Sequence, residues 1–145
     1  MRIAVLADTH GKLPPAVLDS IREADEIWHL GDFDHPGVVD VFRGLGPVFH
    51  GVRGNCDAGI DLPERLFLER GGRSFLLIHI PPSKSGGADF LLHGHTHVPR
   101  DEKIGLTRIL NPGTVGKPNK GAPPGYAWLV IDEATGAVEW NPVRL

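Results

Sequence analysis

Short apolar runs alternate with polar segments rich in glycine and proline along the whole chain. The run over residues 2–7 is continuously apolar, which is typical of a strand buried on both faces. Further strands are predicted over residues 26–30, 48–52, 65–69, 74–79, 89–92, 104–110, 126–132 and 137–141. Helices are predicted after Pro14-Pro15, where proline suits a first helical turn, and over residues 38–45.

The order of these elements predicts the class of fold. The first half reads strand, helix, strand, helix, strand, and the second half is mostly hairpins that turn at Gly71-Gly72 and at residues 134–136. This order predicts an α/β protein with a mixed sheet or with two packed sheets. No shift in composition marks a boundary, so residues 1–145 are expected to form a single domain. Residues 81–87, rich in proline and glycine, are expected to be either a plain surface loop or a mobile lid.

Composition and charge exclude several classes of protein. Hydrophobic residues make up 41% and charged residues 23%, which is ordinary for a soluble globular chain. The net charge of -3 gives no basic surplus for binding nucleic acid or an anionic membrane. The first apolar run ends at Asp8, too early for a membrane span or a signal peptide core. One cysteine, Cys56, excludes an internal disulfide, and we expect a cytoplasmic protein.

Four polar residues follow predicted strands directly, at intervals of 23 or 24 residues: Asp8, Asp32, Asn55 and His79. A strand-helix-strand unit and a hairpin both return the chain to the same edge of a sheet. We therefore expect the four side chains to meet at one edge, where open α/β sheets build their sites. Taken singly, each of these residues could have a purely structural role, as a helix cap, a turn residue or a core histidine.

Three further histidines lie within the run His93-Gly94-His95-Thr96-His97, next to a predicted strand. His10 stands two residues after Asp8, a similar alternate spacing. Imidazole is a good ligand for zinc, manganese, iron or nickel. Because nitrogen and oxygen supply all the ligand atoms, the pattern favours an open catalytic metal site over a structural thiolate zinc site.

The ordered motifs point to a family. They are Asp8-Thr9-His10, Gly31-Asp32, Gly54-Asn55-Cys56-Asp57, His79, Gly94-His95-Thr96-His97 and Asn111-Pro112-Gly113-Thr114. This set resembles the calcineurin-like metallophosphoesterase superfamily, in particular its compact bacterial and archaeal phosphodiesterases. The resemblance implies a two-sheet β-sandwich with mixed sheets, flanked by helices.

The resemblance also implies a site with two divalent transition metal ions, manganese first, with nickel, iron or zinc as alternatives. The first ion would be held by Asp8, His10 and His97, the second by Asn55, His79 and His95, and Asp32 would bridge them. A hydroxide between the ions would attack a phosphodiester, with Asp32, Asn55, Cys56 and His95 as the catalytic residues. His93 has no place in the motif and is expected in the core or behind the ligands, and Gly94 is expected to allow a tight turn.

Three departures from the family pattern concern the site and its substrate. Ile80 replaces the glycine that is common after the histidine at position 79, which affects the local path of the backbone. Cys56 stands where many relatives have a histidine that protonates the leaving group. A thiol is a weak donor, so good leaving groups such as aryl or nucleotide esters would be preferred, unless Cys56 is only a small buried apolar residue. Asp57 then lacks an imidazole partner and is expected to orient backbone. The segment between His79 and His95 is shorter than usual, which would leave the site open.

The sequence therefore predicts a dinuclear phosphodiesterase that acts on a small or nucleotide-like phosphoester. A phosphomonoesterase or a nucleotide pyrophosphohydrolase would use the same site. A different class is a non-enzymatic scaffold on this fold, resembling the retromer subunit that uses it to bind proteins. A homo-oligomer is compatible with the sequence, which does not fix the oligomeric state.

Overall fold

The computed structural model describes residues 1–145 and contains ten strands and two helices. In chain order these are β1 (Arg2–Leu6), α1 (Pro15–Ile21), β2 (Glu26–His29), α2 (Pro36–Arg43), β3 (Val48–Gly51), β4 (Arg65–Arg70), β5 (Arg73–Ile78), β6 (Phe90–Leu92), β7 (Arg100–Ile104), β8 (Thr107–Asn111), β9 (Gly125–Ile131) and β10 (Val138–Arg144). The strands form two five-stranded sheets, in the orders β10-β9-β1-β2-β3 and β4-β5-β6-β8-β7. Both sheets are mixed, since each combines parallel neighbours with antiparallel ones.

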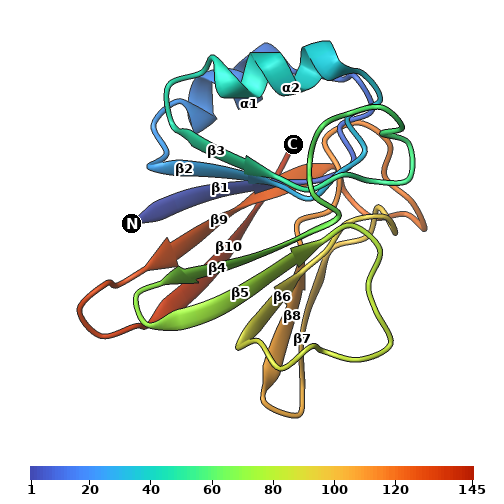
Figure 1. Ribbon diagram of the computed structural model, residues 1–145. Helices are drawn as coiled ribbons and strands as arrows, with labels where there is room; N and C mark the ends of the chain where they lie inside the picture. Colours follow the sequence, from blue (N-terminus) through green and yellow to red (C-terminus); the bar gives the residue numbers. More distant parts are fainter.

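The two sheets pack face to face, and both helices lie on the outer face of the first sheet (Figure 1). A cluster of 15 buried apolar residues, Trp28, Phe75 and Leu129 among them, fills the space between the sheets. A second cluster of 14 residues joins the helices to the first sheet, with Val17 and Ile21 contributed by α1. The predicted α/β fold with two packed mixed sheets is confirmed.

The outer face of the second sheet carries no helix. The segment 80–89, which contains no regular element, lies over it, and a small buried cluster of Leu76, Ala88, Leu91 and Ile109 fills the contact. Proline and glycine in this segment disfavour a helix.

One strand prediction is wrong. Residues 104–110 are not a single strand, because the chain turns at Gly105, with φ at +61°, between the antiparallel strands β7 and β8. Most of β7 is exposed, and its sequence Arg-Asp-Glu-Lys-Ile carries no apolar alternation that could reveal a strand. Polar residues are what an edge strand needs to avoid pairing with other chains.

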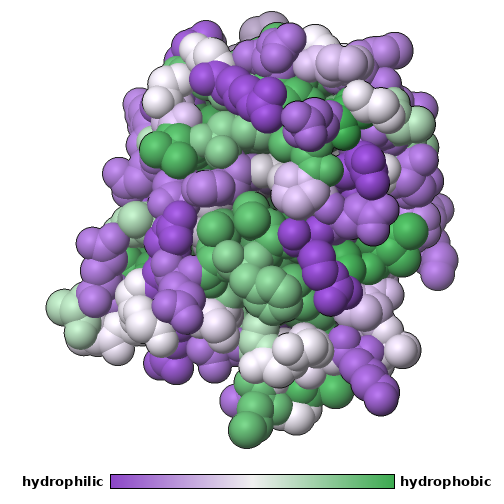
Figure 2. All heavy atoms as spheres, viewed as in Figure 1, coloured by the Kyte–Doolittle hydropathy of each residue, from purple (hydrophilic) through white to green (hydrophobic).

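The surface is mixed in character. Figure 2 shows mostly hydrophilic residues over the helices and an apolar area in the middle of this face, where β4 runs in Figure 1. β4 is an edge strand, and its Phe67 is 58% exposed. Neither helix has the length and apolar content that crossing a membrane requires.

Candidate metal centre

The turns that follow β1, β2, β3 and β5 meet at one end of the sandwich (Figure 1). His79 Nε2 lies 2.9 Å from Asn55 Oδ1, 3.2 Å from Asp32 Oδ2 and 3.8 Å from Asp8 Oδ1. Four residues spread over some seventy positions of sequence therefore share one site. The prediction that these strand-end side chains gather at one edge is confirmed.

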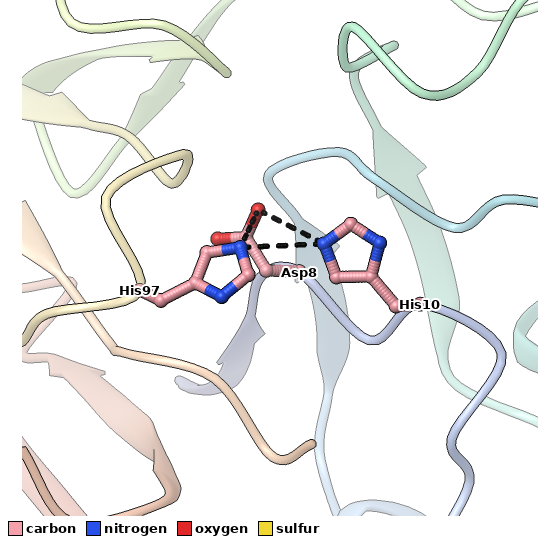
Figure 3. A group of neighbouring side chains, drawn as sticks. All are labelled: Asp8, His10 and His97. Atoms are coloured by element: carbon pink, nitrogen blue, oxygen red, sulfur yellow. Dashed lines mark hydrogen bonds and ion pairs between the residues drawn. The ribbon is translucent and has the colours of Figure 1, made fainter. Parts of the chain in front are cut away.

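His10 and His97 flank the carboxylate of Asp8, as Figure 3 shows. Asp8 Oδ1 lies 3.9 Å from His10 Nε2 and 3.4 Å from His97 Nε2, and the two imidazole nitrogens are 3.3 Å apart. Nitrogen and oxygen atoms that share one transition metal at about 2.1 Å lie roughly 3–3.5 Å from one another. Two of the three separations fall in this range and that between Asp8 and His10 is slightly longer, so small shifts of the side chains would let the group hold one ion.

Asn55 forms the centre of a second group. Its Oδ1 lies 2.9 Å from His79 Nε2 and 3.1 Å from His95 Nδ1. Asp32 lies between the two groups, since its Oδ2 is 3.6 Å from His10 Nε2 and 3.2 Å from His79 Nε2. The structure thus brings together all seven residues that the sequence singled out as ligands.

Hydrogen bonds fix the orientation of three of the imidazoles. Each ring has Nδ1 within 2.8 Å of an oxygen that can only accept, so each must donate Nδ1–H: His10 to Asp34 Oδ1, His79 to the Leu30 carbonyl and His97 to the Lys117 carbonyl. The Nε2 atom of each ring consequently turns toward the carboxylates. Metal-binding histidines in proteins are held by the same kind of bond to their second nitrogen.

Asp8 Oδ1 is a buried polar atom without any hydrogen-bond partner. The residue is completely buried, and burial raises the pKa of its carboxyl group. The nearest side-chain nitrogens, Nε2 of His97, His79 and His10, lie 3.4, 3.8 and 3.9 Å away, longer than a normal hydrogen bond, so a cation is the natural partner for this oxygen. The donor set, composed of nitrogen and oxygen only, suits manganese, iron, nickel or zinc.

Asp32 is held in its charged form. Burial opposes the charge, but in the metal-free protein hydrogen bonds from the protonated form of His79 and from the Cys56 backbone N–H outweigh burial and lower the pKa of Asp32 to about 2. Its side chain is only 3% exposed. A carboxylate therefore stands between the two groups at neutral pH.

Backbone strain is concentrated at this centre. Seven residues other than glycine have a positive φ, and six of them belong to the site: Asp8, His10, Asp32, Asp34, His95 and His97. Such conformations cost free energy for residues with a Cβ atom and are typical of functional sites.

Glycines let the site loops approach one another. Gly31 has φ at +97°, a backbone conformation that residues with a side chain rarely adopt. The φ angles of Gly54 and Gly94 are not positive, and close packing of neighbouring atoms explains why glycine stands at these two positions. A Cβ atom at Gly54 would lie 2.1 Å from Asp32 Oδ1, and one at Gly94 would lie 2.8 Å from Asp8 Oδ2.

Asp57 organises the loop that carries Asp32. It is completely buried and accepts four backbone N–H groups, from residues 32, 33 and 34 at 2.8, 2.8 and 3.0 Å and from residue 54 at 2.8 Å. The prediction that Asp57 orients backbone is confirmed.

Two contributors were missed by the sequence analysis. Asp34 holds His10, and its position two residues after Asp32 repeats the spacing of Asp8 and His10, a signal that could have revealed it. His29 is completely buried, accepts the Gly31 N–H at 3.1 Å and lies 3.2 Å from Thr9 Oγ1. His29 ends an apolar strand, so no pattern distinguished it from a core residue.

Cys56 is exposed, so its interpretation as a small buried apolar residue is wrong. Partial burial and the charge of Asp32 raise the pKa of the thiol to about 11. His93, by contrast, is completely buried behind the site, as predicted.

A two-sheet sandwich whose strand ends gather carboxylates, imidazoles and an amide defines a metallophosphoesterase class of protein. A family model described as the calcineurin-like phosphoesterase superfamily domain matches residues 1–134, and the chain belongs to this family. A probable metallophosphoesterase of Methanothermobacter thermautotrophicus is 33% identical over 79% of this chain and 77% of its own length. Phosphodiesterase YfcE of Escherichia coli strain K12 is 30% identical over 91% of this chain and 89% of its own length.

Solved structures share the fold. The structure of the E. coli phosphoesterase Yfce superposes with a TM-score of 0.77, at 23% identity, over 99% of this chain and 100% of its own. Wild-type Vps29 of Entamoeba histolytica, solved in complex with zinc, gives a TM-score of 0.79 at 22% identity over 99% of both chains.

Proposed function

We propose that this chain is a phosphodiesterase that uses two divalent cations to hydrolyse small or nucleotide-like phosphodiesters. The observation that carries the proposal is the convergence of imidazole and carboxylate acceptors around the unpartnered, buried Asp8 Oδ1. The relative named phosphodiesterase YfcE supports a diester as the substrate. One ion would be held by Asp8, His10 and His97, the other by Asn55, His79 and His95, and Asp32 would contact both.

Two cations bound there would neutralise phosphate oxygens and lower the pKa of a water between them. Asp32, with a pKa of about 2, keeps its negative charge throughout the neutral range. Asn55 and His95 lie next to each other, and both are exposed enough to contact a substrate phosphate. In the metal-free protein the pKa of Cys56 is about 11, and a thiol is a weak proton donor, which favours leaving groups that need no protonation.

The test starts from protein that has been stripped of metal with a chelator. Manganese, nickel, iron and zinc are added back separately, bound metal is counted, and an aryl phosphodiester is assayed against the corresponding monoester. We expect about two ions per chain and faster turnover of the diester. Faster turnover of the monoester would favour a phosphomonoesterase, and no turnover by metal-loaded protein would favour a scaffold.

Asp32→Asn isolates the proposed bridging role. Because changes to residues behind metal ligands already cost about 10–100-fold in affinity or activity, we expect this variant to lose more than about 100-fold of its activity. Asp61→Asn, at an exposed aspartate that is not among the proposed ligands, serves as the matched control. Circular dichroism would verify that both variants fold, and activity of folded Asp32→Asn near the wild-type level would contradict the role.

A further inference from the structure

A cavity of about 520 Å³ opens directly beside the metal centre. His95, whose Nδ1 lies 3.1 Å from Asn55 Oδ1, forms the shared wall. The remaining lining comes from β7, the turn before it and the loop after β8: His93, Thr96, Val98, Pro99, Arg100, Asn119 and Lys120. This volume lies within the range of small-molecule sites.

The charges that line this cavity are positive. Arg100 and Lys120 are its two permanently charged side chains, and no carboxylate lines it. Lys120 forms no ion pair. Arg100 Nε and Nη2 contact Glu102, and Nη1 donates to His93 Nε2 at 3.2 Å. A guanidinium has five N–H groups, so two of them are left for a ligand.

His93 helps to fix the position of the Arg100 guanidinium by accepting a hydrogen bond from it. Its Nδ1 donates to the Gly94 carbonyl at 2.8 Å, so its Nε2 is free to accept from Arg100. The imidazole is completely buried, and Glu102 holds the other side of the guanidinium. An arginine that is bonded on two sides loses little side-chain entropy when a ligand arrives.

A second cavity, of about 340 Å³, adjoins the centre at Asn55 and His79 but differs in charge and polarity. Arg53 in this cavity is paired with Glu64 at 3.0 Å, Arg65 is a second cation in its lining, and Ile78 and Ile80 supply apolar surface. The cavity at Arg100 is the larger of the two, and unlike the other it has no carboxylate in its lining, which favours it as an anion site.

We propose that the cavity lined by Arg100 and Lys120 binds a second phosphate group of the substrate while the first phosphate lies at the metal centre. This inference rests on the proposed phosphodiesterase function. It narrows the substrate class from phosphodiesters in general to nucleotide-like molecules that carry two separate phosphates. His93 is then a positioning residue for Arg100.

The test compares two ligands that differ by one phosphate, thymidine 5′-monophosphate and thymidine 3′,5′-bisphosphate. Isothermal titration calorimetry measures their affinities for manganese-loaded wild-type protein, Arg100→Gln, Lys120→Gln and the double variant. Lys103→Gln is the matched control, because Lys103 lies on the same strand as Arg100, outside the cavity. A charge-assisted hydrogen bond contributes about tenfold or more to affinity, so we expect wild type and Lys103→Gln to prefer the bisphosphate by at least about tenfold.

The proposal predicts that this preference falls in each single variant and disappears in the double variant. Equal affinities in wild type, or a preference that survives in the double variant, would overturn it. Turnover of an aryl diester by the same samples tests the hydrolytic function separately. Loss of the preference in the variants, without turnover by any sample, would support the cavity and contradict the phosphodiesterase. Turnover of the aryl diester without any preference for the bisphosphate would support the phosphodiesterase and contradict the cavity.

Discussion

Asp57→Asn removes one charge from the most heavily bonded side chain of the site while preserving its size. In the native protein, Oδ1 accepts the N–H groups of residues 33 and 34, and Oδ2 accepts those of residues 32 and 54. In the variant one of these oxygens becomes an NH₂ group, which faces two N–H donors and can accept from neither. Two buried backbone N–H groups lose their partner, whichever way the amide turns.

The magnitude follows from these contacts. Hydrogen bonds to a charged group contribute about 1.5–3 kcal/mol each, so the loss of two predicts a destabilisation of about 3–6 kcal/mol. This is a large part of the roughly 5–15 kcal/mol that holds a typical domain together. For a chain of this length it corresponds to a melting temperature lower by roughly 10–20 °C.

Urea unfolding of metal-free protein, followed by tryptophan fluorescence, measures the effect without a contribution from metal binding. Asp61→Asn is the control, and an exposed substitution of this kind is expected to change the free energy of unfolding by less than about 0.5 kcal/mol. If Asp57→Asn lost less than about 1 kcal/mol, the argument that this carboxylate supports the loops at residues 32–34 and 54 would be refuted.

Three further predictions follow from other contacts. Gly54→Ala places a Cβ atom 2.5 Å from the Asp32 backbone nitrogen and should destabilise the fold by about 3 kcal/mol or more in the same urea assay. Gly37→Ala in α2 is the control, because its Cβ atom meets nothing within 4 Å, and it should stabilise the fold by up to about 1 kcal/mol. Burial opposes the charge on Glu26, but hydrogen bonds from Arg70 and Trp28 outweigh it and lower its pKa. The stability that Glu26 contributes is therefore complete above pH 4.5 and is lost as the pH falls through the lowered pKa of the folded state. The loss in free energy of unfolding caused by Glu26→Gln should consequently shrink between pH 7 and pH 3, and a loss that stays constant would contradict this. Manganese at about 100 times its dissociation constant should raise the free energy of unfolding by about 2.7 kcal/mol, and an unchanged melting temperature after chelation would argue against a metal site in the folded protein.

Much of the fold and of the site follows from local patterns. The buried strand at residues 2–7 and the hairpin at Gly71-Gly72 are visible as apolar runs and turn residues, and both are present in the structure. The polar residues that end strands, such as Asp8 and His79, occur at intervals that bring them to one edge, because each strand-helix-strand unit and each hairpin returns to it.

Other features leave no such trace. β7 is exposed and charged, so no burial pattern distinguishes it from a loop; it forms only because β8 offers an edge with which to pair. A strand can be recognised in a sequence by its apolar pattern only where one of its faces is buried, and an edge strand in water need not bury a face.

The sequence by itself determined the chemistry of the protein: which elements are buried, and which nitrogen and oxygen donors follow them. Only the tertiary structure decided how those donors are held. Asp34 aligns His10, Asp57 binds the backbone beside Asp32, and His93 orients Arg100. The physical reason is that these are hydrogen bonds between separate loops, and their existence depends on distances that the packing of the two sheets sets.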